Sequence, residues 1–386
     1  MNRHALTTLA EVAYINPKLT SRINDSDVVS FLGMANVSES GTTEQGEDRS
    51  FAAVRKGFTP FGDGDILVAK ITPCFQNGKI AQARIRRSTG FGSTEFHVIR
   101  PNEQYLDPRY LLHFLRQKRI RVEGEQRMTG SGGQRRVPLN FLQNLQIPLP
   151  PLPDQRQIAA ILDQVDEMRA LRASTVELAN SLLTSTYIDM FGDPIQNPRD
   201  HPTIALDQLG HWKSGGTPSR SNASFFDGQI PWFSSGELDS IYVSESAESI
   251  SASALQKSAA KLVPRGSLML GMYDTAALKS AITMVDCSCN QAIAFSTIDP
   301  ALAVTEFVYH SIQIGKEEFK RQQRGVRQKN LSVSMIKSLR IPLPEISDQR
   351  RFLDRIKEIH LVIDAQHINR IEIDGLAASL ESSLLV

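Results

Sequence analysis

An internal repeat constrains this chain more than any other feature of its sequence. Leu145-Gln-Ile-Pro-Leu-Pro150 recurs as Leu339-Arg-Ile-Pro-Leu-Pro344, and Asp154-Gln-Arg156 recurs as Asp348-Gln-Arg350. Both recurrences are 194 residues apart, whereas Ala5-Leu6-x-x-Leu9 meets Ala205-Leu206-x-x-Leu209 at an offset of 200. The chain is therefore two diverged copies of one unit, with insertions between their early parts.

The segment after each Pro-rich repeat predicts a long helix, because apolar residues recur there at steps of three and four. Such narrow stripes are typical of coiled coils and require one partner helix, for which the other repeat is the obvious candidate. The first helix should end near Phe191-Gly-Asp-Pro194. The stripes are Ile158, Ile161, Val165 and Met168, then Leu171, Thr175, Leu178 and Leu182; and Phe352, Ile356, Ile359 and Ile363, then Ile373, Leu376 and Leu380.

The remaining sequence mixes short strand-like runs with shorter helical patterns, so each globular unit is predicted to be α+β. We divide the chain into residues 1–150, a helix over 151–192, residues 193–344 and a helix over 345–386. Strands are expected at Asp65–Ala69, Phe96–Ile99, Ser267–Leu270 and Gln291–Phe295, and helices at Pro108–Ile120 and Val304–Gln323.

The charges are segregated although their totals nearly cancel, at 43 Lys and Arg against 42 Asp and Glu. Residues 84–136 hold twelve basic and five acidic residues, and residues 313–340 hold eight and two. The long helices are acidic, with three basic and seven acidic residues in 154–193, and five and eight in 345–386. This pattern predicts globular units that contact phosphates and helices that contact protein, although solvated helix faces would also produce it.

Several loops carry residue types that bind phosphates or pair with base edges. One Gly- and Ser-rich loop ends in Gln134, Arg135 and Arg136, and its counterpart carries Arg327, Gln328 and Lys329. A plain surface turn is an equal alternative for these loops. A third loop offers backbone amides, hydroxyls and two charges for phosphate binding, through Lys213, Ser214, Gly215, Gly216, Thr217, Ser219 and Arg220, although it is also read as a simple Gly-rich connection.

Two further loops follow strand-like runs and differ from each other, as expected if two unlike half-sites need two different readers. The first contains Lys70, Thr72, Gln76, Asn77 and Lys79, with Arg84 beyond it, and the second contains Tyr273, Asp274, Thr275 and Lys279. In contrast, Trp232, His97 and His113 are expected in the core rather than at a binding surface.

The sequence contains no nucleotide-binding Gly-x-x-x-x-Gly-Lys-Ser/Thr loop and no His-Glu-x-x-His zinc helix. Phe61-Gly-Asp-Gly-Asp65, with Lys70, could form a nuclease site, but Arg265-Gly-Ser267 in the second copy lacks the carboxylates, so we expect no catalysis. Three cysteines give no disulfide framework, and Cys287 with Cys289 lacks a second pair for zinc. Without a signal pattern or a membrane-spanning run, we expect a cytoplasmic protein.

Over essentially its whole length the sequence resembles the type I restriction-modification specificity subunits. The resemblance rests on Ile147-Pro-Leu-Pro-Pro-Leu-Pro-Asp-Gln-Arg-Gln-Ile158, on Ile341-Pro-Leu-Pro-Glu-Ile-Ser-Asp-Gln-Arg350, and on Gly215-Gly-Thr-Pro-Ser-Arg220 followed by Ile230-Pro-Trp232. The first copy has Ile15-Asn-Pro17 where the second has the Gly-Gly-Thr-Pro loop.

The resemblance implies two target-recognition domains, each reading one half of a bipartite, asymmetric DNA site. It also implies two helices that pack antiparallel as a spacer and recruit two methyltransferase subunits. Restriction subunits complete an ATP-dependent nuclease, and S-adenosylmethionine, ATP and Mg²⁺ would bind those partners rather than this chain. The alternatives are a coiled-coil adaptor that binds only proteins and, third, a metal-dependent nuclease using Asp63, Asp65 and Lys70.

Overall fold

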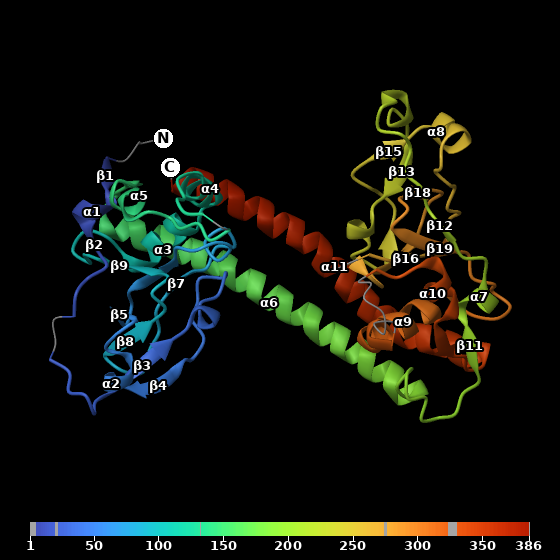
Figure 1. Ribbon diagram of the computed structural model, residues 1–386, viewed down its shortest axis with the longest axis horizontal. Helices are drawn as coiled ribbons and strands as arrows, with labels where there is room; N and C mark the ends of the chain where they lie inside the picture. The colour runs from blue at the N-terminus through green and yellow to red at the C-terminus, as the bar shows by residue number, and fades with distance from the viewer. Residues whose placement is uncertain (1–4, 20–21, 132, 274–275, 323–329, 386) are drawn as a thin grey trace. The chain divides into compact units, whose positions relative to one another are not determined.

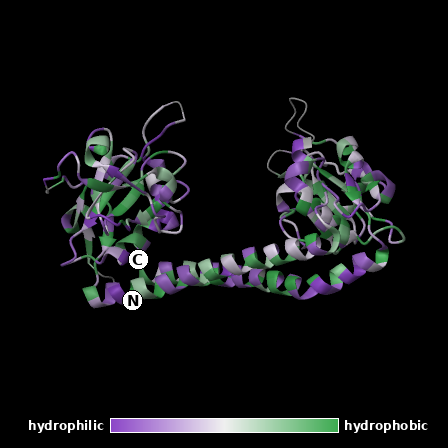
Figure 2. Cartoon of the chain, turned by 90° about the horizontal axis from the view of Figure 1, so that it is seen from below, coloured by the Kyte–Doolittle hydropathy of each residue, from purple (hydrophilic) through white to green (hydrophobic). Residues whose placement is uncertain are grey.

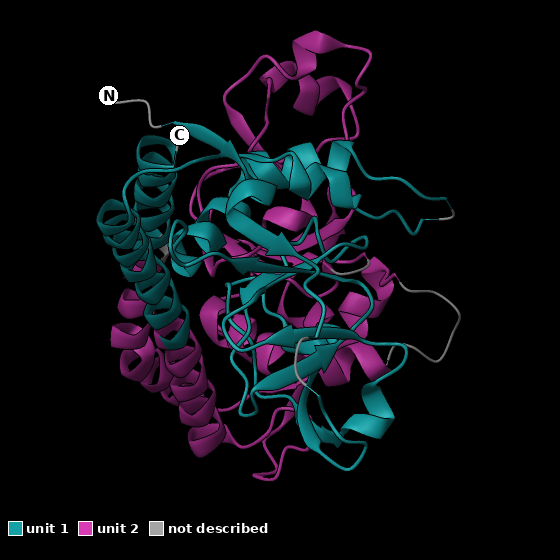
Figure 3. Cartoon of the chain, turned by 90° about the vertical axis from the view of Figure 1, so that its left-hand side faces the viewer, with its two compact units in different colours: residues 1–174, 367–386 teal, residues 175–366 magenta. Residues whose placement is uncertain are grey.

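The computed structural model describes residues 5–19, 22–131, 133–273, 276–322 and 330–385 (Figure 1). They form two compact units, which we call unit 1 (residues 1–174 and 367–386) and unit 2 (residues 175–366) (Figure 3). Each unit combines one globular body with parts of both long helices. The division between the units falls inside the long helices, whereas the boundaries predicted from the sequence lie at the helix ends.

Unit 1 contains two four-stranded sheets and a separate strand pair. The central strand β6 is a continuous run of buried Ile, Leu, Val and Ala, as expected for a strand covered on both faces. The first sheet has the order β2 (Ala13–Ile15), β9 (Phe96–Pro101), β6 (Ile66–Ala69) and β7 (Ile80–Gln82). The second has the order β4 (Glu47–Ser50), β3 (Val28–Leu32), β8 (Thr89–Gly92) and β5 (Thr59–Gly62), and β1 (Leu6–Thr8) pairs with β10 (Gln146–Pro148).

The helices of unit 1 differ from the sequence prediction at one point. The single helix expected over residues 108–120 is two helices, because Gln117 takes extended backbone angles (φ −54°, ψ 137°) between them. The first, α3, is capped by Asp107, which accepts bonds from the amides of Arg109 and Tyr110 at 2.9 and 3.0 Å. The helices are α1 (Leu9–Val12), η1 (Met34–Asn36), α2 (Phe51–Val54), α3 (Pro108–Arg116), α4 (Lys118–Gln126) and α5 (Leu139–Gln143).

Unit 2 repeats this plan, but its two sheets have five and three strands instead of four each. Its larger sheet has the order β12 (Lys213–Ser214), β19 (Ile293–Ser296), β16 (Leu268–Gly271), β17 (Ser280–Thr283) and β14 (Tyr242–Val243). Its smaller sheet has the order β15 (Ser249–Ile250), β13 (Ile230–Phe233) and β18 (Ser288–Cys289), and β11 (Thr203–Ala205) pairs with β20 (Arg340–Pro342). The helices are α7 (Leu206–Leu209), η2 (Ala223–Phe225), η3 (Ser235–Glu237), α8 (Ala252–Lys257), α9 (Thr305–Gln322) and α10 (Val333–Ser338).

Strand pairing confirms the duplication and the α+β class. The order β2-β9-β6-β7 recurs as β12-β19-β16-β17, and the parallel pair β3–β8 recurs as β13–β18. The Pro-rich repeats are edge strands in both units: Ile147 lies opposite Thr7, and Ile341 lies opposite Ile204. Each repeat thus closes its globular body just before a long helix begins.

The two long helices, α6 (Leu152–Phe191) and α11 (Ile346–Leu384), run antiparallel where they meet. In unit 1, Val165 of α6 clusters with Ile373 and Ala377 near the end of α11. In unit 2, Tyr187 near the end of α6 lies 5.5 Å, between ring centroids, from Phe352 near the start of α11. Both helices also carry hydrophobic residues in patches along their length (Figure 2).

The predicted stripe of α6 is wrong in its second half. Leu171, Leu178 and Leu182 are 62%, 68% and 56% exposed, whereas Leu183 and Tyr187 are buried. Leu376 of α11 is likewise 48% exposed. Each long helix therefore carries apolar residues on its exposed side as well as on the side that packs against the rest of its unit. The spacing of apolar residues in the sequence does not show which of these two sides is buried.

Candidate nucleic-acid interface

The structure brings the two candidate loops of unit 1 together. The Thr72 hydroxyl donates to the carbonyl oxygen of Gly133 at 2.8 Å and accepts a bond from the Arg135 amide at 3.1 Å. The Thr72 amide in turn donates to the Arg135 carbonyl at 2.9 Å. Residues 70–79 and the described residues of 129–136 (129–131 and 133–136), which are separate in sequence, therefore form one surface, which we call the loop pair of unit 1.

Unit 2 has the equivalent backbone link at the matching place. In unit 1 the amide of Val137 donates to the carbonyl of Lys70 at 2.8 Å, and in unit 2 the amide of Leu331 donates to the carbonyl of Met272 at 2.7 Å. Val137 and Leu331 are 194 residues apart, which is the offset of the repeat. The predicted residues Asp274, Thr275, Arg327, Gln328 and Lys329 lie outside the described residues.

Most of the predicted cations in unit 1 already have partners within the unit. Arg136 makes a bidentate ion pair with Glu95, whose pKa this hydrogen bond lowers. Arg135 donates to the carbonyl of Glu125 at 3.0 Å, and Lys79 donates to the carbonyl of Met34 at 3.2 Å. These side chains stabilise the loop pair as it stands.

The remaining predicted residues of unit 1 divide into held and unpaired side chains. Gln76 donates to the carboxylate of Glu125 at 3.1 Å, and Arg84 donates to the side chain of Gln82 at 3.2 Å. Among the described residues, the side chains of Lys70, Asn77 and Gln134 make no hydrogen bond or ion pair, and those of Asn77 and Gln134 are exposed. These three are the side chains that a ligand meets without first breaking a contact.

The Gly-rich loop of unit 2 does not offer the backbone amides that the sequence led us to expect. The amide of Gly215 donates to the carbonyl of Ile293 at 3.0 Å, and the amide of Gly216 donates to the carbonyl of Cys289 at 2.9 Å. The carbonyl of Gly216 accepts a bond from the Trp232 indole at 3.1 Å. Both glycines therefore attach the loop to the sheets, and their amides are not available to a phosphate.

The side chains of the same loop are partly used as well. Arg220 pairs with Glu248 at 2.7 Å and lies over the rings of Phe226 and Trp232. The hydroxyl of Thr217 donates to the side chain of Gln291, and the hydroxyls of Ser219 and Ser221 share a hydrogen bond. Ser214 accepts a bond from Lys261 through its backbone carbonyl, whereas Lys213 is exposed and its side chain has no partner among the described residues.

Of the second reading loop in unit 2, Tyr273 and Lys279 can be placed. Tyr273 is 36% exposed and lies directly after the link through Met272. Lys279 donates to the carbonyl of Gly236 at 3.2 Å. Because the Tyr273 side chain is partly exposed beside this backbone link, it is well placed to stack or hydrogen-bond.

The basic bias of residues 84–136 has an origin that sequence reasoning missed. Arg109 and His113 of α3 bond to Asp163 of α6, and Arg116 of α3 bonds to Asp166 of α6. Burial opposes ionisation of Asp163, but the bonds from His113 and Arg109 outweigh it and hold its pKa at about 2. The sequence carried one signal for these ion pairs. Basic residues of α3 are spaced by three and four, and acidic residues of α6 are spaced by three.

The carboxylates considered for a nuclease have structural partners instead. Asp65 is buried, pairs with Arg100 at 2.8 Å, and accepts a bond from the amide of Gly62 at 2.7 Å. Asp63 accepts a bond from the amide of Ile85 at 2.9 Å. In the described residues, no group of three or more His, Cys, Asp or Glu side chains is arranged to hold a metal ion. Among them, too, no helix is long and apolar enough to cross a membrane.

The residues assigned to the core are confirmed there. Trp232 is buried, and His97 and His113 are buried with hydrogen-bond partners: the Nε2 of His97 lies 2.9 Å from the carbonyl of Val137, and that of His113 lies 2.7 Å from Asp163. His97 also lies 3.4 Å from the side chain of Asn16, which bonds to the backbone of Val98. Asn16 therefore anchors the segment that replaces the Gly-rich loop in the first copy.

Comparison with known proteins gives concordant matches. A family model described as the type I restriction modification DNA specificity domain matches residues 7–177 and 198–373. The chain is 38% identical over 170 residues to the EcoAI specificity subunit of Escherichia coli, covering 42% of this chain and 29% of that protein. It is 40% identical over 161 residues to the EcoEI specificity subunit of the same organism, covering 41% and 27%. The matches thus span under a third of these two relatives.

A more distant relative matches over most of both chains. The putative type I restriction enzyme MjaX specificity subunit of Methanocaldococcus jannaschii is 21% identical over 343 residues, covering 83% of this chain and 77% of that protein. Among solved structures, the S subunit of a type I restriction-modification system from M. genitalium aligns over 100% of this chain and 97% of that chain, with a TM-score of 0.59 at 13% identity. A chain from a structure of a type I R-M system aligns over 100% and 98%, with a TM-score of 0.52 at 18% identity. These structural likenesses establish the fold.

Proposed function

Because this chain belongs to the family of type I restriction-modification DNA specificity domains, we propose that it recognises double-stranded DNA by sequence, as the specificity subunit of such a complex. Each unit reads one half of a bipartite, asymmetric site. The chain itself performs no covalent chemistry. S-adenosylmethionine, ATP and Mg²⁺ bind to methyltransferase and restriction subunits, and the complex works in the cytoplasm.

The single observation that carries this proposal is the paired-loop surface, which has the same backbone link in both units but different side chains. The link is Val137 to Lys70 in unit 1 and Leu331 to Met272 in unit 2. After it the sequence reads Ile-Thr-Pro-Cys-Phe in unit 1 and Tyr-Asp-Thr-Ala-Ala in unit 2. One scaffold that presents two unlike surfaces suits a site with two unlike halves, since base identity is read by side chains at groove edges.

Among the candidate loops, including the Gly-rich loop of unit 2, the unpaired side chains are the strongest candidates for contact. We assign phosphate contacts to Lys70 and Lys213, because neither side chain has a partner among the described residues. We assign base-edge contact to Gln134, whose exposed amide suits the paired donor and acceptor of adenine. Arg135, Arg136 and Arg220 act mainly by holding the loops.

The exposed apolar faces of the long helices support a role in docking methyltransferase subunits. In unit 1, Leu171 of α6 and Ile371 of α11 are 62% and 72% exposed; in unit 2, Leu178 and Leu361 are 68% and 58% exposed. Exposed leucine and isoleucine in such numbers mark protein-binding surfaces. The helices also set the gap between the two half-sites.

Salt dependence of DNA binding tests the proposal against a coiled-coil adaptor that binds only proteins. The chain is assembled with its methyltransferase partner, and the dissociation constant for duplex DNA is measured between about 50 and 200 mM salt. We expect affinity to fall steeply with salt, and Lys70→Gln to weaken binding and reduce the logarithmic slope by about one. Lys56→Gln, which removes the same charge from the turn between α2 and β5, should leave both unchanged. A flat salt response would favour the adaptor.

A further inference from the structure

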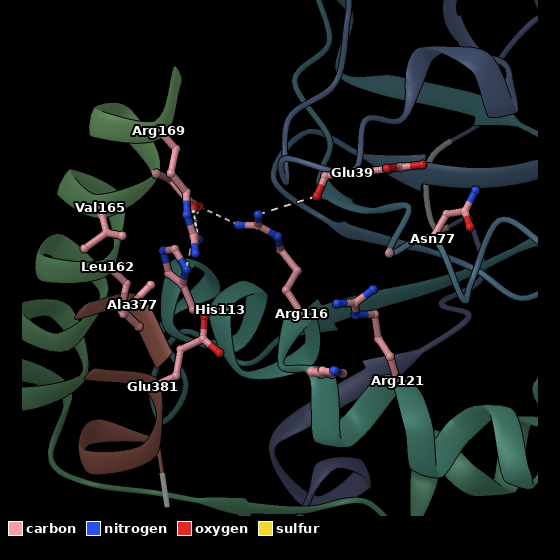
Figure 4. Close-up of a pocket in the computed structure, with 13 residues that line it drawn as sticks. Glu39, Asn77, His113, Arg116, Arg121, Leu162, Val165, Arg169, Ala377 and Glu381 are labelled. Atoms are coloured by element: carbon pink, nitrogen blue, oxygen red, sulfur yellow. Dashed lines mark hydrogen bonds and ion pairs between the residues drawn. The ribbon is translucent and has the colours of Figure 1, made fainter. Parts of the chain in front are cut away.

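Unit 1 contains a polar cavity that the proposed function does not use. It has a volume of about 330 Å³ and is lined by residues of α3, α4, α6 and α11 together with Glu39 and the turn at Asn77 and Gly78 (Figure 4). Leu162, Val165 and Ala377 supply its apolar lining. Its cations are Arg116 of α3, Lys118 and Arg121 of α4, and Arg169 of α6.

The cations on the α4 side of the cavity have no acidic partner. Arg116 and Arg169 share Asp166, at 2.5 and 3.5 Å, and Arg169 also pairs with Asp374 at 3.0 Å. In the part of the chain that the structure describes, no carboxylate lies within ion-pair distance of Lys118 or Arg121. Arg116 and Arg169 are therefore neutralised by ion pairs, whereas Lys118 and Arg121 make none with the described residues; the acidic residues Glu39 and Glu381 also line the cavity.

Arg121 is also left with an unused hydrogen-bond donor. Its Nη1 donates to the carbonyl of Gln76 at 3.0 Å, whereas its Nε is buried and has no partner in the described structure. A buried donor without an acceptor is unfavourable and rare in folded proteins. A ligand that accepts this bond would remove the penalty.

Two glycines make room for the guanidinium groups at the cavity. A Cβ atom at Gly41 would lie 2.9 Å from Nη1 of Arg116, and one at Gly78 would lie 3.1 Å from Nη1 of Arg121. Both glycines have positive φ, at +90° and +81°, which a side chain would disfavour. The backbone thus packs closely on both arginines and fixes their positions.

We propose that this cavity binds a small phosphate-bearing anion, held by Arg121 and Lys118 with the Asn77 amide as a further donor. A planar guanidinium suits phosphate oxygens, and a lysine adds a point charge. The volume lies at the lower end of the range for small-molecule pockets. Glu381 lies on the opposite side, beside His113 (Figure 4), so its carboxylate opposes the bound anion.

Calorimetric titration of the full-length chain with inorganic phosphate and with pyrophosphate, at low ionic strength, tests this assignment. We expect saturable binding to one site, weakened roughly tenfold or more by Arg121→Gln or Lys118→Gln, because each removes a charged contact. Glu381→Gln should strengthen binding. Opposite effects from opposite sides of the cavity are the signature of this site.

Two control variants distinguish binding in the cavity from binding to cationic side chains elsewhere. Arg127→Gln at the end of α4 removes the same charge from a residue paired with Glu123, and Lys70→Gln removes it from the proposed DNA surface; both should leave the affinity unchanged. Absence of saturable binding, or equal loss in Arg127→Gln and Arg121→Gln, would overturn the proposal. If Arg121→Gln changes the circular dichroism spectrum and thus the fold, the test rests on Lys118→Gln, because Lys118 is exposed. The result is independent of DNA recognition.

Discussion

Gln155 and Gln349, which are 194 residues apart, make the same buried hydrogen bonds in their respective units. The side chain of Gln155 accepts a bond from the Asp107 amide at 2.8 Å and donates to the carbonyl of Pro150 at 2.8 Å. Gln349 accepts a bond from the Val304 amide at 2.9 Å and donates to the carbonyl of Pro344 at 2.8 Å. The repeated Asp-Gln-Arg motif thus fastens the first turn of each long helix to the globular body beside it.

Replacing either glutamine should destabilise its unit. Gln155→Ala or Gln349→Ala leaves a buried amide and a carbonyl unpaired, and we expect each to lower the free energy of unfolding by about 2 kcal/mol. Urea denaturation measures the change. Gln134→Ala, which truncates an exposed glutamine, should change the stability by less than about 0.5 kcal/mol. If Gln155→Ala and Gln134→Ala changed the free energy of unfolding equally, Gln155 would not anchor the long helix.

A stacked histidine pair predicts acid sensitivity of unit 2. The rings of His310 (α9) and His360 (α11) lie 5.1 Å apart at an interplanar angle of 18°, and the Nε2 of each is buried without a partner in the described structure. Burial lowers the pKa of His310 to about 3, and it lowers that of His360, which Asp364 and Glu306 partly oppose. Tyr309 and Phe352 pack on the His310 ring.

Because the folded pKa of His310 lies below the unfolded value, the unfolded state binds the proton first. The stability from neutral His310 is therefore complete above pH about 6.5 and is lost as the pH falls toward 3. By pH 5 the loss should be about 2 kcal/mol. In urea denaturation, His310→Leu should reduce the stability difference between neutral pH and pH 5 by about this amount, and exposed His211→Leu should not. An unchanged difference in His310→Leu would show that folding does not shift the pKa of this histidine.

The length of the long helices should set the gap between the half-sites. Removing about seven residues from both α6 and α11 shortens the pair by roughly 10 Å, or about 3 base pairs of B-DNA. We expect the methylated sites of such a variant to keep both half-sites and lose about three bases between them. A variant that still assembles yet keeps the original gap would exclude this role of the helices.

Features set by local pattern were predictable from the sequence, and features set by long-range pairing were not. The ends of α6 and the core strands β6 and β16 follow from apolar periodicity with Gly and Pro nearby. The break at Gln117 has no such signal. The use of the Gly215 and Gly216 amides depends on carbonyls of residues 293 and 289, some seventy residues away, which no loop sequence reveals.

The candidate site was predicted in part for the same reason. Residue type identified Lys70 and Gln134, whose side chains have no partner among the described residues, but it equally identified Arg135 and Arg136, which are held by Glu125 and Glu95. The sequence also could not show that Leu171 and Leu178 of α6 are exposed, because a docking stripe and a packing stripe share one periodicity. Only the three-dimensional structure shows which of these side chains already have partners within the chain.

Mapping methylated bases in cells that carry this chain with its methyltransferase partner tests the central claim most directly. We expect a methylated motif of two unlike halves that disappears without the chain, and exchange of residues 1–150 for those of a relative should replace one half only. Methylation that persists without the chain, or an exchange that alters both halves together, would contradict recognition by two separate units.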